Sequence, residues 1–195
     1  MKKKCASLLF SLILIFTVLP SANADFTYLF PVAGCKTTYS KYHHDYPATD
    51  INQVSKKAKC QFVAPIGGTV EDVNLKDVWT FKTNRGQDRG GISVSFIGDD
   101  GVRYYGSHLA SVNEGIEPGV RIEQGDVLGI VGSTGSAKGT RAHLHFGISY
   151  PTKAGDWEIR RGVIWPWKYL DAWRIGKNLS PVSAIEKARV KAGNQ

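Results

Sequence analysis

The sequence predicts a mainly β protein in which a compact antiparallel β-sheet forms one domain. Between residues 26 and 149, short runs rich in β-branched and aromatic residues alternate with turns of glycine, proline and acidic residues. Almost no stretch of this region shows a helical period of apolar residues. Short strands joined by frequent turns are typical of all-β domains, and the chain length suits a single core.

The first 24 residues predict a secretory signal peptide. Three lysines follow Met1, an apolar stretch runs from Leu8 to Leu19, and the small residues Ala22 and Ala24 form a cleavage signal. The apolar stretch is shorter than the roughly 20 residues of a membrane span. We therefore expect an exported protein, periplasmic or extracellular at the cell wall, without stable membrane insertion after cleavage. An uncleaved N-terminal anchor is the alternative.

The domain that follows, residues 25–178, is expected to contain six strands. We place them where β-branched and aromatic residues concentrate, at residues 61–64, 68–74, 91–97, 102–108, 126–131 and 142–149. Turn sequences separate these strands, among them Gly98-Asp99-Asp100-Gly101 and the glycine-rich residues 132–139.

The C-terminal part of the chain departs from this pattern. An aromatic segment from Trp165 to Leu170, joined by Trp173, is expected to pack on the sheet as an irregular cover. Residues 179–195 form a basic tail, within which residues 182–191 are rich in alanine, lysine, arginine and glutamate. This composition predicts a short exposed helix.

The net charge is positive but does not single out a partner. It falls from +8 to +5 once the lysines at positions 2, 3 and 4 leave with the signal peptide. A moderately basic exported protein is attracted to any anionic surface. The sequence contains neither a run of arginine and lysine with interleaved aromatic residues nor the spacing of a zinc finger. We therefore expect no nucleic-acid partner.

The cysteines predict a disulfide bond. Cys5 lies in the signal peptide, so the exported chain keeps the pair Cys35 and Cys60. Two cysteines in an exported protein favour a disulfide. A metal site formed by two thiolates is the alternative, but the pair lacks the close C-x-x-C spacing of such sites.

The strongest local motif is an alternating segment with two histidines. The chain has five histidines in all, at positions 43, 44, 108, 143 and 145. In a strand, His143 and His145 share one face, about 7 Å apart by the strand rise, while Leu144 and Phe146 face a core. Two imidazoles on one face can share a metal ion, or one can bind it while the other works beside it. The alternative is a pair of solvated histidines on an exposed sheet.

A second motif brings histidine and a carboxylate together. If Asp50 and Ile51 enter a strand, Asp50 faces away from the core and can join His44 or His43 at a cation. Two imidazoles and one carboxylate leave zinc a vacant position for water. The alternative is a turn aspartate with a surface histidine. A third candidate is His108, which ends an expected strand and can reach over a neighbouring site.

These segments together resemble the M23 family of peptidoglycan metallopeptidases, the LytM-like or lysostaphin-type endopeptidases. Four motifs occur in the family order: His44 with Asp50, Tyr105-Gly106-Ser107-His108-Leu109, the glycine-rich residues 129–135, and His143-Leu144-His145-Phe146. One spacing differs from the family's His-x-x-x-Asp, because His44 precedes Asp50 by six residues and His43 precedes it by seven. We prefer His44 as the first ligand because a shorter loop is easier to hold rigid, and we keep His43 as the alternative.

The resemblance implies a LytM-like fold and one Zn²⁺ per chain, held by His44, Asp50 and His145. It implies that His108 and His143 are catalytic histidines beside the metal, although their individual roles stay open. The expected activity is hydrolysis of peptide cross-links in bacterial peptidoglycan by metal-activated water, carried out by a monomer. The bond cut, whether a D-alanyl to diaminopimelate link or a glycine bridge, stays open.

Other function classes fit the sequence less well. The chain has no His-Glu-x-x-His motif and no Gly-x-Ser-x-Gly motif, which excludes the zinc-helix proteases and disfavours a serine hydrolase. A catalytically silent wall-binding or activator module of the same fold is the main alternative, and a periplasmic zinc carrier is another. Because the metal set is complete and His108 and His143 accompany it, we expect an active enzyme.

Overall fold

The computed structural model describes residues 26–153 and 155–193, so the expected signal peptide lies outside the described residues. In this part of the chain the strands are β1 (Val32–Ala33), β2 (Thr37–Thr38), β3 (Thr49–Gln53), β4 (Gln61–Val63), β5 (Gly68–Asn74), β6 (Ile92–Gly98), β7 (Arg103–Val112), β8 (Arg121–Ile122), β9 (Val127–Val131) and β10 (His143–Ser149). The helices are α1 (Trp157–Arg160), α2 (Trp167–Arg174) and α3 (Val182–Lys191), with short 3₁₀ turns η1 (Gly86–Asp88) and η2 (Gly135–Ala137).

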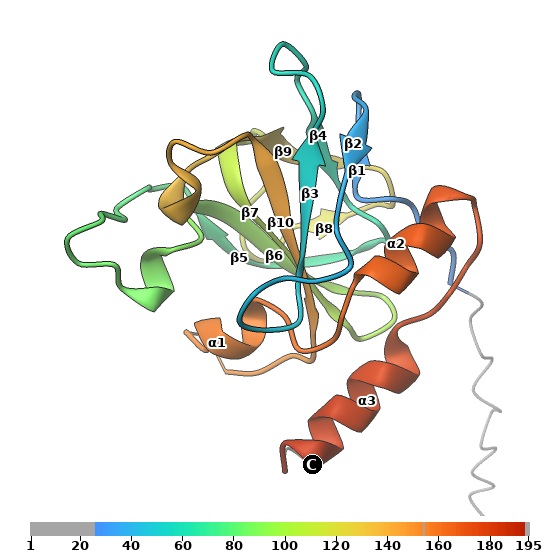
Figure 1. Ribbon diagram of the computed structural model, residues 1–195. Helices are drawn as coiled ribbons and strands as arrows, with labels where there is room; N and C mark the ends of the chain where they lie inside the picture. Colours follow the sequence, from blue (N-terminus) through green and yellow to red (C-terminus); the bar gives the residue numbers. More distant parts are fainter. Residues whose placement is uncertain (1–25, 154, 194–195) are drawn as a thin grey trace, which may run out of the picture.

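The strands form one antiparallel sheet, as the sequence predicts (Figure 1). Its main path runs β1-β4-β9-β7-β10-β3-β2, while β6 joins β7 to β5 and β8 pairs with β5. The strand β10 therefore lies between β7 and β3. Because all three strands carry site residues, this order brings segments together that are far apart in the sequence.

Strand β7 changes partners within its length. Its first half, Arg103 to Ser107, pairs with β10 on one side and with β6 on the other. From Leu109 to Val112 it pairs with β9. Between the two halves stands His108, whose backbone has a φ of 65°. The strand thus continues beyond His108, where the sequence predicted its end, and His108 lies at the bend.

The core lies on one face of β10 and its neighbours. Leu144, Phe146 and Ile148 are fully buried, as the alternation in this strand predicts. They join the buried aromatic and aliphatic side chains of β4, β6 and β7, such as Phe62 and Phe96. This packing fixes β10, so the direction of its two histidines is set by the sheet.

The six expected strands all occur, with bounds that differ by a few residues from those predicted. The strands β1, β2 and β8 are two residues long, too short to produce an alternating pattern. The aromatic segment is not an irregular cover: residues Trp167–Arg174 form helix α2. Its buried side chains Tyr169, Leu170 and Trp173 lie three and four residues apart, on the face that packs on the core. The predicted tail helix is α3.

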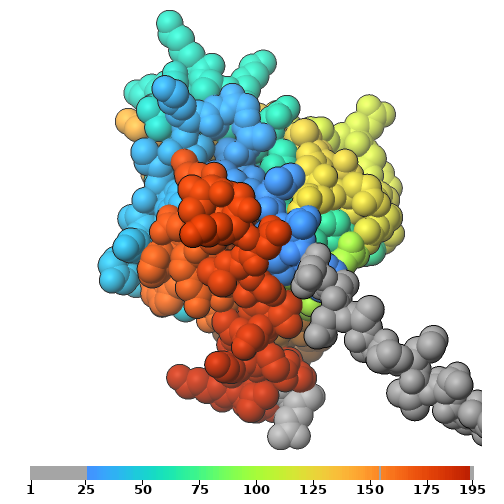
Figure 2. Space-filling model, turned by 90° about the vertical axis from the view of Figure 1, so that its right-hand side faces the viewer, coloured from blue at the N-terminus to red at the C-terminus, as the bar shows by residue number. Residues whose placement is uncertain are grey.

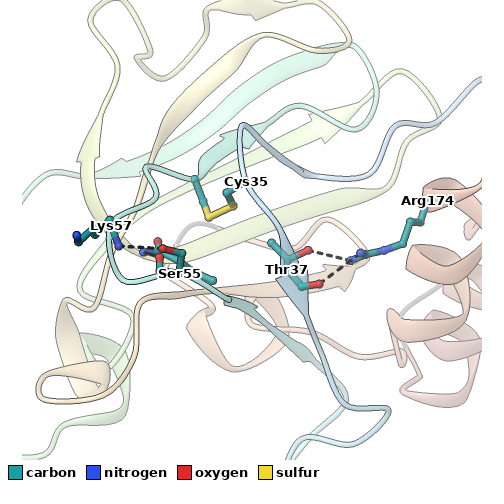
Figure 3. The surroundings of a disulfide bond; sticks show 7 residues. Cys35, Thr37, Ser55, Lys57 and Arg174 are labelled. Carbon is teal, nitrogen blue, oxygen red and sulfur yellow. Dashed lines mark hydrogen bonds between the residues drawn. A yellow bond between two sulfur atoms is a disulfide. The ribbon is translucent and has the colours of Figure 1, made fainter.

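The predicted disulfide between Cys35 and Cys60 is present (Figure 3). It joins the turn between β1 and β2 to the residue before β4. Nearby, Arg174 of α2 donates hydrogen bonds to the hydroxyl and carbonyl oxygens of Thr37. The N-terminal strands are therefore fixed to the sheet by a covalent bond and to the C-terminal helix by hydrogen bonds.

The first described residues pack on the C-terminal segment around α2 (Figure 2). The ring of Tyr28 stacks on that of Trp173 with centroids 5.1 Å apart. The amide of Tyr28 donates to the side-chain oxygen of Asn178, in the segment between α2 and α3. Among the helices of the described residues, none has the length and apolar character needed to cross a membrane.

Candidate active site

All five histidines line one cavity of about 300 Å³. Its walls come from the loop before β3, from β7 and β10, from the segment around η1, and from α1 with the residues that follow it. The three sequence motifs that contain histidine therefore converge, as the sequence predicts.

A group of three potential metal ligands lies in this cavity. His43, Asp50 and His145 offer ligand atoms that lie within 4.8 Å of one another. Asp50 on β3 pairs directly with His145 on β10, which places both side chains on the same face of the sheet. Asp50 Oδ1 lies 3.0 Å from His145 Nδ1, and Asp50 Oδ2 lies 3.9 Å from His43 Nε2. Two imidazoles and a carboxylate form the kind of donor set that binds catalytic zinc.

The structure brings His43 to this group, contrary to the expected preference for His44. The ring of His44 stacks on the outer side, with its centroid 4.5 Å from that of His43. His43 packs against Tyr46 at 4.6 Å and against His145 at 5.1 Å between ring centroids. The preference for His44 rested on loop length, but one extra residue changes loop-closure entropy very little. The packing of Tyr46 decides which histidine turns inward.

The hydrogen bonds of His145 show that this group fits a divalent cation. His145 Nε2 lies 3.2 Å from the backbone carbonyl oxygen of Arg161. A carbonyl oxygen only accepts, so Nε2 carries a proton, and in the singly protonated ring Nδ1 carries the lone pair. That lone pair faces a carboxylate oxygen of Asp50. Two electron-rich atoms at this distance need a proton or a metal ion between them, and the carbonyl of Arg161 orients the ring as outer partners of metal ligands do.

The electrostatics of the group favour metal binding at neutral pH. Burial, aided by the neighbouring His145, lowers the pKa of His43 to about 4, so its imidazole is neutral and can donate a lone pair. Burial raises the pKa of Asp50, but the close contact with His145 and the other nearby imidazoles outweigh it and hold that pKa below its usual value. A neutral imidazole beside an ionised carboxylate is the protonation state that a metal ion requires.

His108 and His143 stand beside the three ligands. The ring centroid of His108 lies 5.0 Å from that of His143 and 5.9 Å from that of His145. Each ring is fixed through Nδ1, which lies 2.8 Å from a backbone carbonyl oxygen: that of Thr134 for His108 and that of Arg141 for His143. Because the carbonyls accept, both Nδ1 atoms carry protons, which leaves Nε2 of each ring for proton transfer.

The glycine-rich motif before β10 serves to hold His108. The hydroxyl of Thr134 donates to the carbonyl of Leu109 and accepts from the amide of Ile92, while its own carbonyl accepts from His108. These bonds stabilise the bend at His108, whose left-handed backbone is unfavourable for a residue other than glycine. Burial and the two neighbouring histidines lower the pKa of His108 to about 3, so its ring is neutral and able to accept a proton.

Several cavity residues have no sequence signal that predicts their place. The hydroxyl of Tyr46 lies 3.4 Å from His145 Nε2, although no sequence pattern marks Tyr46 as a residue of the site. Arg160 and Arg161, with Trp157, reach the cavity from the segment after β10. They follow the last recognisable motif, and only the packing of α1 against the sheet brings them to the site.

Comparisons with known proteins agree with this arrangement. The family model described as "Peptidase family M23" matches residues 49–157, more than half of the chain. No curated protein matches the chain.

Three solved structures share the fold. One is a protein of Ruminococcus gnavus named as a glycyl-glycine endopeptidase, LytM, with a TM-score of 0.61 and 20% identity over 78% of this chain and 62% of that one. This chain thus covers less than two thirds of it. Another is the catalytic domain of the antimicrobial peptidase lysostaphin of Staphylococcus simulans, with a TM-score of 0.50 and 19% identity over 70% of this chain and 92% of that one.

The third is the longer lysostaphin chain from Staphylococcus simulans, with a TM-score of 0.54 and 21% identity over 83% of this chain and 59% of that one. At these identities the three structures establish a common fold. The family model adds a match in sequence that spans Asp50, His108, His143 and His145. The chain therefore belongs to peptidase family M23.

Proposed function

We propose that this chain is an exported zinc metalloendopeptidase that hydrolyses peptide cross-links of bacterial peptidoglycan. The observation that carries the proposal is the cluster of His43, Asp50 and His145, with His108 and His143 beside it, in the cavity of an M23 chain. The order of the sequence motifs supports peptidoglycan as the substrate. The names of two similar structures, a glycyl-glycine endopeptidase and the antimicrobial peptidase lysostaphin, are in keeping with that substrate.

In this proposal His43, Asp50 and His145 hold one zinc ion per chain, with His43 in the place that the sequence favoured for His44. Bound zinc would polarise the scissile carbonyl and lower the pKa of a bound water toward about 7. The protein's part is to keep the three ligands in one geometry. The sheet register fixes Asp50 opposite His145, and the Arg161 carbonyl fixes the ring of His145.

His108 and His143 act on the substrate through Nε2. Their Nδ1 atoms are engaged by backbone carbonyls, so each Nε2 can accept a proton or, once protonated, donate one to the leaving amine or to the oxyanion. Two histidines of this kind let one ring receive a proton while the other supplies one. The neutral state of His108 suits it to the accepting role.

The proposal also includes that the chain is exported and acts as a monomer. The disulfide supports an oxidising compartment, because such bonds persist outside the cytosol. The expected signal peptide, residues 1–24, supports the same conclusion from the sequence. The expected location is the periplasm or the cell wall.

Adjacent histidines provide a matched test of the proposed site. We expect the purified exported chain to contain about one zinc and to release peptides from wall sacculi, and chelation to abolish that release. His43→Ala should lose both zinc and activity, whereas His44→Ala should keep its zinc. Metal analysis and mass spectrometry of released peptides provide the two readouts.

The outcomes test the proposed activity and the identity of the first ligand separately. A wild-type chain that binds zinc but leaves sacculi and defined cross-linked peptides intact would show that the proposed activity is wrong. Loss of zinc from His44→Ala with retention in His43→Ala would reverse the assignment of the first ligand.

A further inference from the structure

The cavity around the proposed metal ligands is rich in arginine. Four arginines line it, at positions 89, 141, 160 and 161, against two acidic residues, Asp45 and Asp50. Asp50 belongs to the proposed metal set, and a bound divalent cation would add further positive charge. The cavity is therefore positive overall, which favours an anionic ligand.

Arg161 differs from Arg160 and Arg89 in its partners, and from Arg141 in its burial, because Arg141 is exposed. Arg160 forms an ion pair with Asp72, and Arg89 donates a hydrogen bond to Asn84. The guanidinium of Arg161 forms none of the ion pairs found within the described residues. Its Nε atom is buried and has no hydrogen-bond partner in that part of the chain. A buried N–H of a cationic group that has no acceptor is costly, so such an atom indicates a missing anionic partner.

Arg161 is held in place by two aromatic rings that lie next to its guanidinium and through its backbone. The Cζ atom lies 3.9 Å from the centroid of the Tyr46 ring and 4.9 Å from that of Trp157. Stacking of this kind fixes the plane of the group but leaves its edge, where the N–H donors lie, for a ligand. The position is thus preorganised for an acceptor that approaches in the plane of the guanidinium.

The backbone at Arg161 is fixed by two close approaches. A Cβ atom at Gly147 of β10 would lie 2.3 Å from the carbonyl oxygen of Arg161, and one at Gly162 would lie 2.2 Å from that of Pro47. Neither position has room for a side chain. The segment is therefore clamped between β10 and the loop that carries His43, so the guanidinium has a fixed relation to the metal ligands.

The guanidinium lies close to those ligands. The Tyr46 ring on which it stacks contacts His43, and the Tyr46 hydroxyl lies 3.4 Å from His145 Nε2. The carbonyl of Arg161 itself accepts from His145. A substrate group bound at the guanidinium edge would therefore belong to a residue next to the bond that is cut.

We propose that Arg161 binds a free carboxylate of the substrate, so that the site selects a peptide with an anionic residue beside the scissile bond. The inference rests on the proposed function and narrows its substrate class. A guanidinium matches a carboxylate with two parallel N–H···O bonds. A direct cross-link through diaminopimelate carries a carboxylate at that place, because one end of the diamino acid keeps its carboxyl group free. A glycine bridge carries none.

A binding experiment tests this without relying on cleavage. The probes are two uncross-linked stem peptides that end in diaminopimelate and contain no bond to cut. They are identical except that the diaminopimelate carboxylates are free in one and carboxamides in the other. Titration calorimetry with the zinc-loaded exported chain gives the ratio of the two dissociation constants. We expect the carboxylate form to bind about 10- to 100-fold more tightly, the range for a charge-assisted pair.

Substitutions of Arg161 test whether this residue causes the preference for the carboxylate probe. Arg161→Gln should bring the ratio close to one, and Arg161→Lys, which keeps the charge but not the planar fork, should give an intermediate ratio. The matched control is Arg174→Gln, because Arg174 also stacks on two aromatic rings, those of Phe30 and Tyr39, but does not line the cavity. This control should keep the wild-type ratio.

Each remaining outcome counts against the proposal. A wild-type ratio near one, binding of neither probe, or an unchanged ratio in folded Arg161→Gln would overturn it. None of these results tests the proposed activity, which is measured separately by peptide release from sacculi. An enzyme that cuts glycine bridges and ignores the carboxylate would confirm the activity while excluding this specificity.

Discussion

Both ring nitrogens of His145 have a close polar neighbour. The Arg161 carbonyl engages Nε2, while Nδ1 faces Asp50 across paired strands. His143, two residues earlier on the same strand, has its Nδ1 engaged by the Arg141 carbonyl instead. The two histidines of one motif thus have different partners, and this difference distinguishes the proposed ligand from the proposed proton-transfer residue.

This difference predicts distinct effects of substitution. His145→Ala and Asp50→Ala each remove one of three ligands, so bound zinc and peptide release should fall together. His108→Ala and His143→Ala remove a proton-transfer partner only, so zinc should stay near one per chain while turnover falls by about 10² to 10⁴. Metal content and turnover are measured on the same folded proteins. Zinc lost from His143→Ala and kept in His145→Ala would mean that the two roles are exchanged.

The choice between His43 and His44 shows where prediction from the sequence ends. The motifs predict that histidines and Asp50 converge, because strand alternation and family order are properties of the sequence. The direction of two adjacent side chains in a loop depends on what packs around them. Here Tyr46 covers His43, and no sequence pattern marks that contact. The place of Arg161 in the cavity could not be predicted for the same reason, because it also depends on packing.

Asp100 gives a residue-scale prediction on pH. Its carboxylate accepts from the hydroxyls of Tyr28 and Tyr104. Burial raises the pKa of Asp100 in spite of these bonds. The folded state therefore binds this proton more tightly than the unfolded state, and its stabilising effect is full below the unfolded pKa of 3.8 and is lost as pH rises through the folded pKa.

Asp100→Asn removes this titration. The free energy of unfolding of the wild type, minus that of the variant, should therefore fall as the pH rises from 3.8 through the folded pKa and then stay level. Urea unfolding of both proteins over a series of pH values measures the difference, and other titrating groups cancel in it. A difference that rises over this range would mean that the folded pKa is lowered.

At the scale of elements, the disulfide shapes the segment that carries His43 and Asp50. The bond closes a loop of 25 residues that contains both β2 and β3. Prediction of this bond needed only an exported pair of cysteines. Prediction of the short strands that it fixes was not possible, because a strand of two residues is defined by its partner and not by its own sequence.

Removal of the disulfide should lower the free energy of unfolding and weaken zinc binding. In the chain-entropy model, a loop of this length contributes about 3 kcal/mol, so Cys35→Ser with Cys60→Ser should lower the free energy of unfolding by about that amount. Urea unfolding of chelated samples measures it without the added stability from bound zinc. Zinc titration of the folded variant should show weaker binding. Equal stability of the two proteins would mean that the loop is already ordered in the unfolded chain.

For the molecule as a whole, the N-terminal and C-terminal segments of the described residues complete the core together. The ring of Tyr28 stacks on that of Trp173 in helix α2, and the Trp173 ring also lies 6.4 Å from those of Tyr104 and Phe146. The sequence predicts that the aromatic segment covers the sheet, because its side chains are too large and apolar to stay exposed. It does not predict the helix, since the eight residues Trp167–Arg174 offer only about two turns of pattern.

Trp173 is therefore expected to contribute to the stability of the whole domain. Its side chain is 3% exposed, and its indole N–H donates to the carbonyl of Leu179. Trp173→Ala should lower the free energy of unfolding by about 3 to 5 kcal/mol, because it leaves a cavity and an unpaired carbonyl. The control is Trp167→Ala, in the same helix, where the partly exposed ring meets Lys41. That variant should lose much less stability.

The position of Trp173 distinguishes a general loss of stability from damage to the site. Trp173 does not line the cavity, and its ring meets Tyr104 and Phe146, the neighbours in sequence of the cavity residues Tyr105 and His145. Trp173→Ala that remains folded at low temperature should therefore bind zinc as the wild type does, while its denaturant midpoint falls. Calorimetric zinc titration at a temperature well below unfolding measures the first quantity, and urea unfolding the second. Weak zinc binding by the folded variant would mean that packing on the core face of β10 also sets the direction of His145.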